Sequence, residues 1–504
     1  MRWLIGFFLV MVPLSLRGDS HSDWASKIHE IHLSNGLNFL FYERGEAPIF
    51  SAYIRFRAGG IDEPPGKTGL AHFLEHMAFK GTQTLGTTDF KKEKPLLDEI
   101  EKVGEELSRE YTKANAANTD HIKELREKLR ALHKEEEKYI VKEAIARKMM
   151  ENGGVDLNAT TSKDMTSYFV NLPSDKLKFW ASVESERIFK PVFREFYEEK
   201  DVVLEERRMR VDNDPDGRLY EAFLSTAFEK SPYRWPTIGS VDDVLRLTRH
   251  DLENFWKRYY RPSRFAGVLV GNLNQKEVES VLNQTFGKIR FEDPSEKSSD
   301  LADHDQEPVQ KEERRVVLKM AAKPRFLMGY HKPAVSFADD YAFDLLDQIL
   351  GDGRSSRLYR ELVVEKKLVS GVGTSTDVPG LRLPNLYLIE VNPLPGHSSE
   401  EVVALIDQEI QKIQEGGVTS AEFEKAKNRL MAAFLFKMET NEEIASRLSY
   451  FQTAIGNWRY LANYLDEINR LKIEDVQRVV KEYLRKNNRT IAEIKSSEEG
   501  MPSP

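Results

Sequence analysis

The sequence of 504 residues contains no cysteine. This absence excludes disulfide bonds, thiol catalysis, cysteine zinc sites and lipid attachment through a cysteine. Clustered basic stretches are also lacking, and the net charge of −8 does not indicate a nucleic-acid-binding protein. Because a chain without thiols is suited to an oxidising compartment, we expect a periplasmic or secreted bacterial protein.

Long hydrophobic runs are missing as well. The run from Leu4 to Leu16 follows the single charge of Arg2 and is too short to span a bilayer as a helix. We therefore expect residues 1–20 to be a signal peptide, and the alternative is an uncleaved membrane anchor. No other segment is apolar enough to cross a membrane, so we expect no span after removal of the signal.

The remaining chain has patterns of both strands and helices. Short apolar runs lie between Ile28 and Arg57, and Asn35-Gly36 between the first two is a hairpin-turn signal. Helical periodicity begins near Thr68. Residues 292–314 are rich in charge, serine and proline and are predicted to form a linker.

The two sides of this linker resemble each other. Leu247, Asp251 and Tyr259 each match an identical residue 224 positions later, and a strand pattern follows both copies. We therefore predict an α+β fold with two homologous α/β-sandwich domains in tandem, one at 24–291 and one at 315–497.

Residues 91–150 interrupt the first domain with a segment dominated by lysine, glutamate and arginine. Apolar residues recur at helical spacing from Leu97 to Leu107 and from Ile122 to Leu132, with a turn signal at 114–118. We expect a charged antiparallel helical hairpin that projects from the domain and can be trimmed without loss of metal binding. The alternative is a solvated, partly disordered segment.

A metal-binding pattern lies in the first helical stretch. His72 and His76 are four residues apart, so on a helix they share one face and can hold one zinc ion. Glu75 lies on the same side and can act as general base toward a bound water. The spacing is the inverted form of the commoner zinc-peptidase motif. The alternative is a chance match of three fixed positions.

Two glutamates further along the chain fit the same site. Glu199 and Glu206 are seven residues apart, which is two helical turns, so both face one way. One of them can ligate zinc while the other orients a histidine. The alternative is a charged, solvent-facing side of a helix.

The residues around these positions carry a resemblance to a known family. The stretch from Gly69 to Thr82 resembles the active-site helix of the pitrilysin or insulinase family, peptidase family M16, which includes mitochondrial processing peptidase. Residues 158–168 resemble the family's edge strand, which receives the substrate backbone, and 343–358 resemble its second-domain signature. This chain looks like the zinc-motif-bearing subunit of bacterial members similar to mitochondrial processing peptidase.

The resemblance implies half of a clamshell and a zinc metalloendopeptidase that hydrolyses unfolded or extended peptides in an enclosed chamber. It implies one zinc ion per chain and assigns roles to seven residues: zinc ligands His72, His76 and Glu206, general base Glu75, orienting carboxylate Glu199, and substrate neighbours Asn158 and Ala159. The alternative is a non-catalytic scaffold or assembly subunit on the same fold.

One departure from the family concerns the second domain. Active members supply an arginine and a tyrosine there, and this sequence has Val363 and Ser370 at the matching positions. The resemblance therefore implies a heterodimer in which a related subunit supplies the pair. Arg357, Tyr359 and Arg360 lie nearby and are the alternative source.

Overall fold

The computed structural model describes residues 23–291, 307–335 and 339–496. The predicted signal peptide at 1–20 and most of the predicted linker at 292–314 lie outside the described residues. No helix within the described ranges is long and apolar enough to cross a membrane.

The first half of the chain builds a six-stranded sheet. Its strands lie in the order β1 (Ile28–His32), β2 (Asn38–Glu43), β6 (Phe265–Gly271), β3 (Ile49–Phe56), β5 (Thr166–Pro173) and β4 (Val155–Thr161). Only the pair of β2 and β6 is parallel. The predicted hairpin joins β1 to β2, and Gly36 takes the positive φ of 89° that its turn requires. β1 and β4 are the two edges of this sheet.

The second half repeats this topology with five strands. They lie in the order β7 (Arg314–Met320), β11 (Arg489–Ser496), β8 (Arg325–Lys332), β10 (Asn385–Pro393) and β9 (Val369–Val378). The pair of β7 and β11 is parallel and the others are antiparallel. The order therefore matches that of β2 to β4, and the predicted tandem α/β architecture is confirmed.

The sequence repeat has a structural cause. The helix α10 (Arg249–Tyr259) precedes β6, and α17 (Ile473–Tyr483) precedes β11 at the same separation of 224 positions. Asp251 and Asp475 occupy the third position of these helices and accept hydrogen bonds from the backbone N–H of Thr248 and Lys472 at 3.0 and 2.9 Å. Both repeated aspartates therefore cap a helix start.

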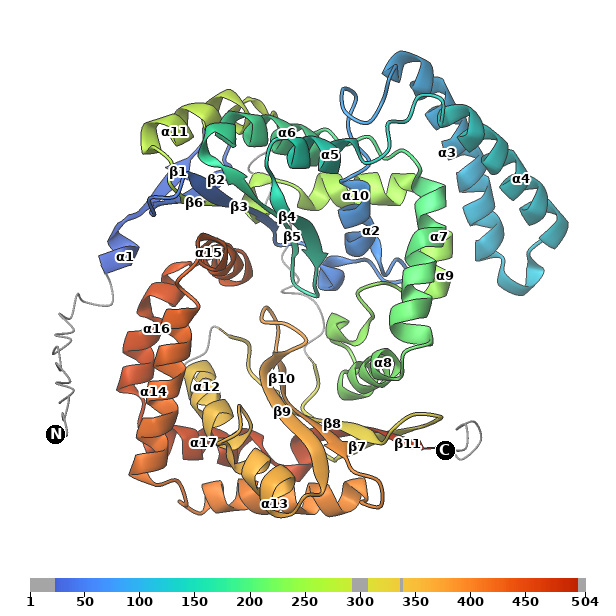
Figure 1. Cartoon of the computed structure of the whole chain (residues 1–504). Helices are drawn as coiled ribbons and strands as arrows, with labels where there is room; N and C mark the ends of the chain where they lie inside the picture. The colour runs from blue at the N-terminus through green and yellow to red at the C-terminus, as the bar shows by residue number, and fades with distance from the viewer. Residues whose placement is uncertain (1–22, 292–306, 336–338, 497–504) are drawn as a thin grey trace, which may run out of the picture.

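The other helices pack on the two sheets or on one another. They are α1 (Asp23–Ser26), α2 (Leu70–Met77), α6 (Leu177–Phe189), α7 (Phe196–Arg207), α9 (Val241–Arg246), α11 (Gln275–Gln284), α12 (Asp339–Leu350), α13 (Ser399–Gln414), α14 (Ser420–Phe436) and α16 (Arg459–Arg470). In the first half, α6, α10 and α11 share one large core with the outer face of the sheet (Figure 1).

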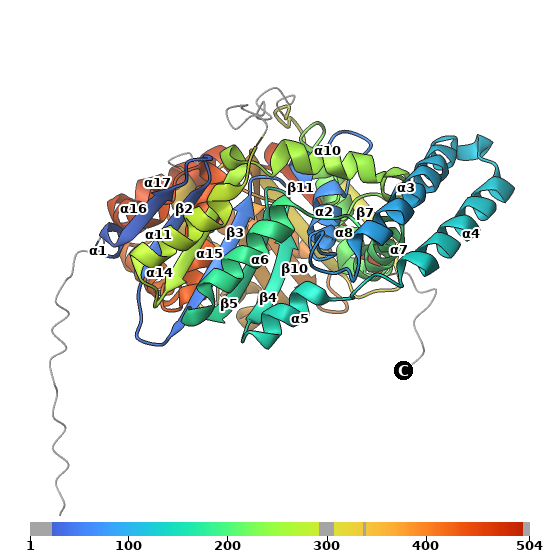
Figure 2. The ribbon, with the colours of Figure 1, turned by 90° about the horizontal axis from the view of Figure 1, so that it is seen from above.

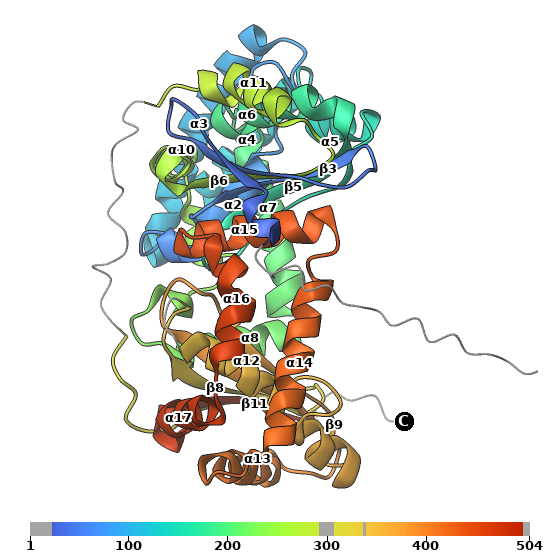
Figure 3. The same cartoon turned by 90° about the vertical axis from the view of Figure 1, so that its left-hand side faces the viewer.

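Each half contributes one helix that packs on the sheet of the other half. The helix α8 (Pro215–Ala227) leaves the first half and buries Phe223 against the second sheet, where Gly329 leaves room for its ring. The helix α15 (Asn441–Ile455) belongs to the second half and buries Leu448 against the inner face of the first sheet. The exchange is visible in Figures 1 and 3. The two halves therefore pack as one unit.

The inserted segment forms the expected helical hairpin of α3 (Phe90–Thr112) and α4 (Thr119–Glu136), which extends beyond the body of the protein in Figure 2. A third helix, α5 (Ala144–Glu151), follows before the chain enters β4, and it was not predicted from the sequence.

The hairpin is not a free projection along its whole length. Glu93 at its base forms a fully buried ion pair with Arg194 at 2.6 Å. Gly104 of α3 lies directly against the ring of Tyr197 on α7, where a Cβ atom would approach ring carbons to 2.0 Å. Because α7 carries both predicted site glutamates, the hairpin supports the helix on which they lie.

This contact generates a first prediction. Gly104→Ala should lower the midpoint of thermal unfolding, because overpacking of a close contact costs about 1–3 kcal/mol, and it should weaken zinc binding by displacing α7. Gly287→Ala is the matched control, since its methyl group would meet no heavy atom closer than 3.6 Å. Thermal unfolding and zinc titration of both variants provide the measurement. Unchanged values for Gly104→Ala would show that α7 does not depend on the hairpin.

Candidate metal centre

The site is built on α2, and its first turn is fixed by two local features. Gly69 has a φ of 96°, and a Cβ atom there would lie 2.9 Å from the carbonyl oxygen of Ile238. The Glu63 side chain accepts hydrogen bonds from the backbone N–H groups of Gly69 and Ala71 at 2.9 and 2.8 Å. A carboxyl group at this end of a helix satisfies donors that have no intrahelical partner.

The structure brings the three predicted ligands together. His72 and His76 project from one face of α2, and Glu206 projects toward them from α7. Their ligand atoms all lie within 4.8 Å of one another. Glu206 Oε2 is 3.6 Å from His72 Nε2 and 3.5 Å from His76 Nε2. Arg210 contacts the other oxygen of Glu206 at 3.0 Å, which leaves Oε2 directed at the histidines.

These donors fit a zinc ion. Two ligands bound tetrahedrally at about 2.1 Å lie about 3.4 Å apart, close to the distances from Glu206 to both histidines. Two imidazole nitrogens and one carboxylate oxygen are also the donor types that zinc accepts in catalytic sites, where a fourth position stays open.

The two histidines differ in protonation when no metal is bound. Burial and, to a smaller extent, the neighbouring His76 lower the pKa of His72 to about 4, so His72 is neutral at pH 7. Burial also disfavours the charged form of His76, but the hydrogen bonds that its ring donates to the Glu199 and Glu206 carboxylates outweigh this effect and raise the pKa of His76 to about 9. Binding of a metal therefore displaces a proton from His76.

A second layer of charges holds His76 in place. Glu199 Oε1 lies 2.9 Å from Nδ1 of His76, so the imidazole directs Nε2 at the metal position. Lys80 donates to Glu199 at 2.6 Å and contacts Glu195 at 3.3 Å. The predicted orienting carboxylate thus lies where that role requires it. The Nδ1 atom of His72 is buried and has no hydrogen-bond partner among the described residues.

Glu75 lies on the open side of the donor set. Its carboxylate accepts a hydrogen bond of 2.5 Å from the hydroxyl of Thr161 on β4. Burial raises the pKa of Glu75, and the Thr161 hydrogen bond opposes this shift only in part. A carboxylate with a raised pKa takes up a proton more readily, as a general base near neutral pH must.

The free edge strand β4 lies beside this group. Asn158 and Ala159 line a cavity of about 890 Å³ together with both histidines and Glu75. The strand is bulged near Asp156, which has a φ of 54°, and within the described part of the chain its outer edge pairs with no other strand. An extended peptide can therefore pair with this edge directly beside the metal position.

Four residues that support the site were not predicted from the sequence: Glu63, Lys80, Thr161 and Arg210. The positions of Lys80 and Arg210, each four residues after a predicted ligand, could have indicated a shared helix face. Glu63 and Thr161 act from a loop and a strand, and nothing in their spacing pointed to α2.

Among the described residues, the second half contributes none to this cavity or to the adjoining one, and the lining residues lie between His72 and Arg210. Val363 packs against the core of the second half, and Ser370 donates to the carbonyl of Asn392 at 3.1 Å. Arg357 pairs with Glu422 at 2.6 Å, so its guanidinium is engaged.

Two helical histidines, a distant glutamate, a carboxylate on the open side and a free strand edge are the features of the zinc-peptidase class of metal centre. Sequence models of known protein families support this class. The model of insulinase (peptidase family M16) matches residues 42–122 and 130–240, and that of the peptidase M16 inactive domain matches 246–430. The chain belongs to the peptidase M16 family.

Individual relatives cover nearly the whole chain. Zinc protease PqqE of Helicobacter pylori is 28% identical over 502 residues, 98% of each chain. The uncharacterised zinc protease ML0855 of Mycobacterium leprae is 25% identical, over 85% of this chain and 83% of that protein.

Solved structures show the same fold. A protease from Helicobacter pylori superposes with a TM-score of 0.77 at 26% identity, over 93% of this chain and 99% of that one. The periplasmic protease PqqL from Escherichia coli gives a TM-score of 0.68 at 18% identity, and the match covers 94% of this chain but 48% of that one. This chain therefore has the fold of half of that protein.

The geometry generates a prediction about the metal. Glu206→Gln should weaken zinc binding by more than about 100-fold, since loss of a direct ligand exceeds the cost of losing an outer partner. Glu205→Gln is the matched control, because Glu205 is half exposed and pairs with Arg208. Zinc content after dialysis and competition with a chelator measure the effect. Equal zinc retention by both variants would remove Glu206 from the site.

Proposed function

We propose that the protein is a zinc metalloendopeptidase that cleaves unfolded or extended peptides. The observation that carries this proposal is the convergence of His72, His76 and Glu206 beside the carboxylate of Glu75. The names of the relatives, which are zinc proteases, support the metal and the reaction class. One zinc ion per chain follows from the single donor set found among the described residues.

The residues of the site have separate roles in peptide hydrolysis. The substrate backbone pairs with the edge of β4 and places the scissile bond near Asn158 and Ala159. Glu75 takes the proton of the attacking water and then delivers it to the leaving amine. Thr161 holds the Glu75 carboxylate in position for both transfers. Zinc bound at the site would lower the pKa of its water toward about 7 and polarise the carbonyl.

We further propose that the chain acts with a different subunit of the same family. Its own second half has Val363 and Ser370 where an arginine and a tyrosine are expected. Valine and serine cannot stabilise a developing oxyanion as arginine and tyrosine would. A homodimer would repeat this deficiency in both halves. A sister subunit that carries the pair would complete an enclosed chamber and its site.

We also propose export to the periplasm or beyond, directed by a signal peptide at 1–20. The absence of cysteine in the sequence fits this location. PqqL, which shares the fold, is described as periplasmic.

The second candidate function is a non-catalytic scaffold of the same family. Val363 and Ser370 favour it, because the chain lacks its own electrophilic pair. The intact set of His72, His76, Glu75 and Glu206 argues against it, since a scaffold has no need of an ordered metal site.

The role of Glu75 generates a prediction. Glu75→Gln should retain zinc and lose about 10²–10⁴-fold in peptide hydrolysis, because an amide cannot accept the proton of water. Thr161→Val should also retain zinc and lose a smaller part of the activity, because this substitution removes the hydrogen bond that positions the Glu75 carboxylate but leaves the carboxylate itself in place. Zinc content and turnover of an unstructured peptide measure both effects. Substantial turnover by Glu75→Gln would assign the base to another group.

The proposed heterodimer leads to a further testable prediction. The chain purified free of other proteins should bind zinc but hydrolyse peptides poorly, because each missing oxyanion donor costs about 10²–10³ in rate. Addition of a related subunit that carries the arginine and tyrosine should restore turnover. Zinc-dependent cleavage by the isolated chain at a rate that the added subunit does not raise would contradict the heterodimer. No cleavage in either sample would favour the scaffold.

A further inference from the structure

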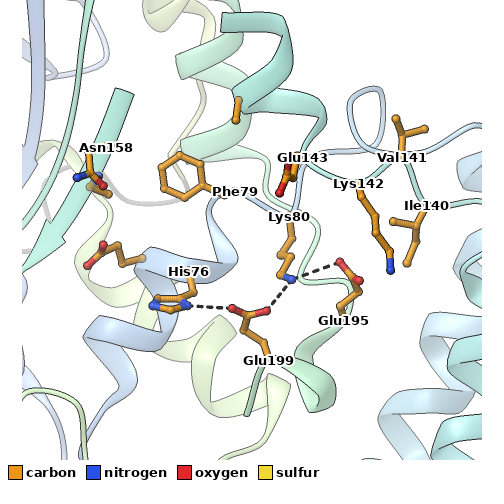
Figure 4. Close-up of a pocket in the computed structure, with 13 residues that line it drawn as sticks. His76, Phe79, Lys80, Ile140, Val141, Lys142, Glu143, Asn158, Glu195 and Glu199 are labelled. Carbon is orange, nitrogen blue, oxygen red and sulfur yellow. Dashed lines mark hydrogen bonds and ion pairs between the residues drawn. The ribbon is translucent and has the colours of Figure 1, made fainter. Parts of the chain in front are cut away.

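A second cavity adjoins the metal centre on the side of the inserted segment. It measures about 450 Å³, and it shares four lining residues with the cavity at the site: Glu75, His76, Asn158 and Ala159. Phe79 forms an apolar wall, while Ile140 and Val141 of the inserted segment face it (Figure 4). This insertion-lined pocket therefore opens beside the place where a bound peptide would be cleaved.

The wall from the inserted segment is held rigidly. Val141 donates a backbone hydrogen bond to Gly86 at 3.0 Å, and Thr88 donates one to Tyr139 at 2.8 Å. Immediately afterwards, Ala144 and Ile145 are buried at the start of α5. Glu143, between these two anchors, therefore has a fixed backbone position.

The backbone at the pocket is unusual. Five non-glycine residues of the described chain have a positive φ, and two of them, Glu143 at 52° and Glu195 at 58°, line this one pocket. Such conformations cost free energy and are concentrated at functional sites. Both residues are glutamates at the start of a helix, and neither side chain caps its own helix.

The charges of the pocket do not balance. Lys80 is shared by Glu199 and Glu195, so these three side chains together keep one negative charge. Lys142 also lines the pocket, but its ammonium group pairs at 3.1 Å with Glu137, which lies outside the lining. Within the described part of the chain, no ion pair or hydrogen bond engages the Glu143 carboxylate. The pocket therefore offers an apolar wall and an unpaired carboxylate at its edge.

We propose that the inserted segment completes a pocket for one substrate side chain, and that Glu143 selects lysine or arginine there. This inference rests on the proposed peptidase function. The long apolar stem of either residue can lie along Phe79 and Ile140, and its cationic end can reach the free carboxylate of Glu143. An acidic side chain would meet uncompensated negative charge. The insertion thus acts on the choice of substrate as well as on the support of α7.

Peptide binding to zinc-loaded Glu75→Gln protein tests the inference without cleavage. The probes are short glycine-serine peptides with a single central lysine, norleucine or glutamate, and their affinities are measured by fluorescence anisotropy. The lysine peptide should bind roughly two- to fivefold more tightly than the norleucine peptide, the size expected of a partly exposed ion pair, and the glutamate peptide should bind most weakly.

Two further substitutions and a control variant test whether Glu143 causes the preference for lysine. Glu143→Gln should abolish the preference for lysine, and Glu143→Lys should invert it in favour of glutamate. Glu151→Gln removes an exposed charge at the far end of the same helix and should change nothing. A lysine preference that persists in Glu143→Gln, or equal binding of all three peptides, would overturn this inference and leave the peptidase proposal standing. Absence of binding by every peptide would overturn both.

Discussion

The hydrogen bond between Nδ1 of His76 and the Glu199 carboxylate ties α2 to α7, although the two residues are 123 positions apart in the chain. The metal donors on these helices can converge only if the helices stay face to face. Lys80 balances part of the charge that this contact brings into a largely buried region. Such a network stabilises the site when it is complete, because an unpaired buried charge is costly.

The inserted hairpin and the exchange of helices extend the same constraint to the rest of the molecule. The hairpin packs against α7 through Gly104 and Tyr197, and the buried pair of Arg194 and Glu93 fixes its base just before α7 begins. α8, which is joined to α7 by a π-helical segment at Arg208–Asp212, is anchored on the second sheet. The position of α7 therefore depends on both halves of the chain, and so does the metal centre.

The predictable and unpredictable parts of the structure differ in the range of the interactions that determine them. The face shared by His72 and His76 is a consequence of helical periodicity, and the spacing of Glu199 and Glu206 follows the same rule, so local sequence was sufficient. The tandem topology was predictable because the capping aspartates Asp251 and Asp475 repeat with their helices.

Other features depend on contacts across the fold. An apolar helix face shows that α8 and α15 are buried, but not that each packs on the sheet of the other half. Thr161 and Glu63 act through hydrogen bonds to residues distant or irregularly spaced in sequence. α5 lies between the hairpin and β4, where its short apolar pattern was merged with the charged segment. The position of Glu143 in a pocket likewise emerges only once the hairpin has folded back.

The repeat also explains why the described residues contain one cluster of metal-ligating side chains rather than two. In the second half, α12 follows β8 as α2 follows β3, but it carries aspartates and no histidine. Asp340 accepts hydrogen bonds from Lys332 and Tyr460, and Asp344 accepts one from Tyr464 at 2.6 Å. Both tyrosines belong to α16, whose Leu461 and Leu465 join the core shared with the first sheet. The second copy of this helix therefore uses its polar face to hold the two halves together, and only α2 presents a pair of histidines.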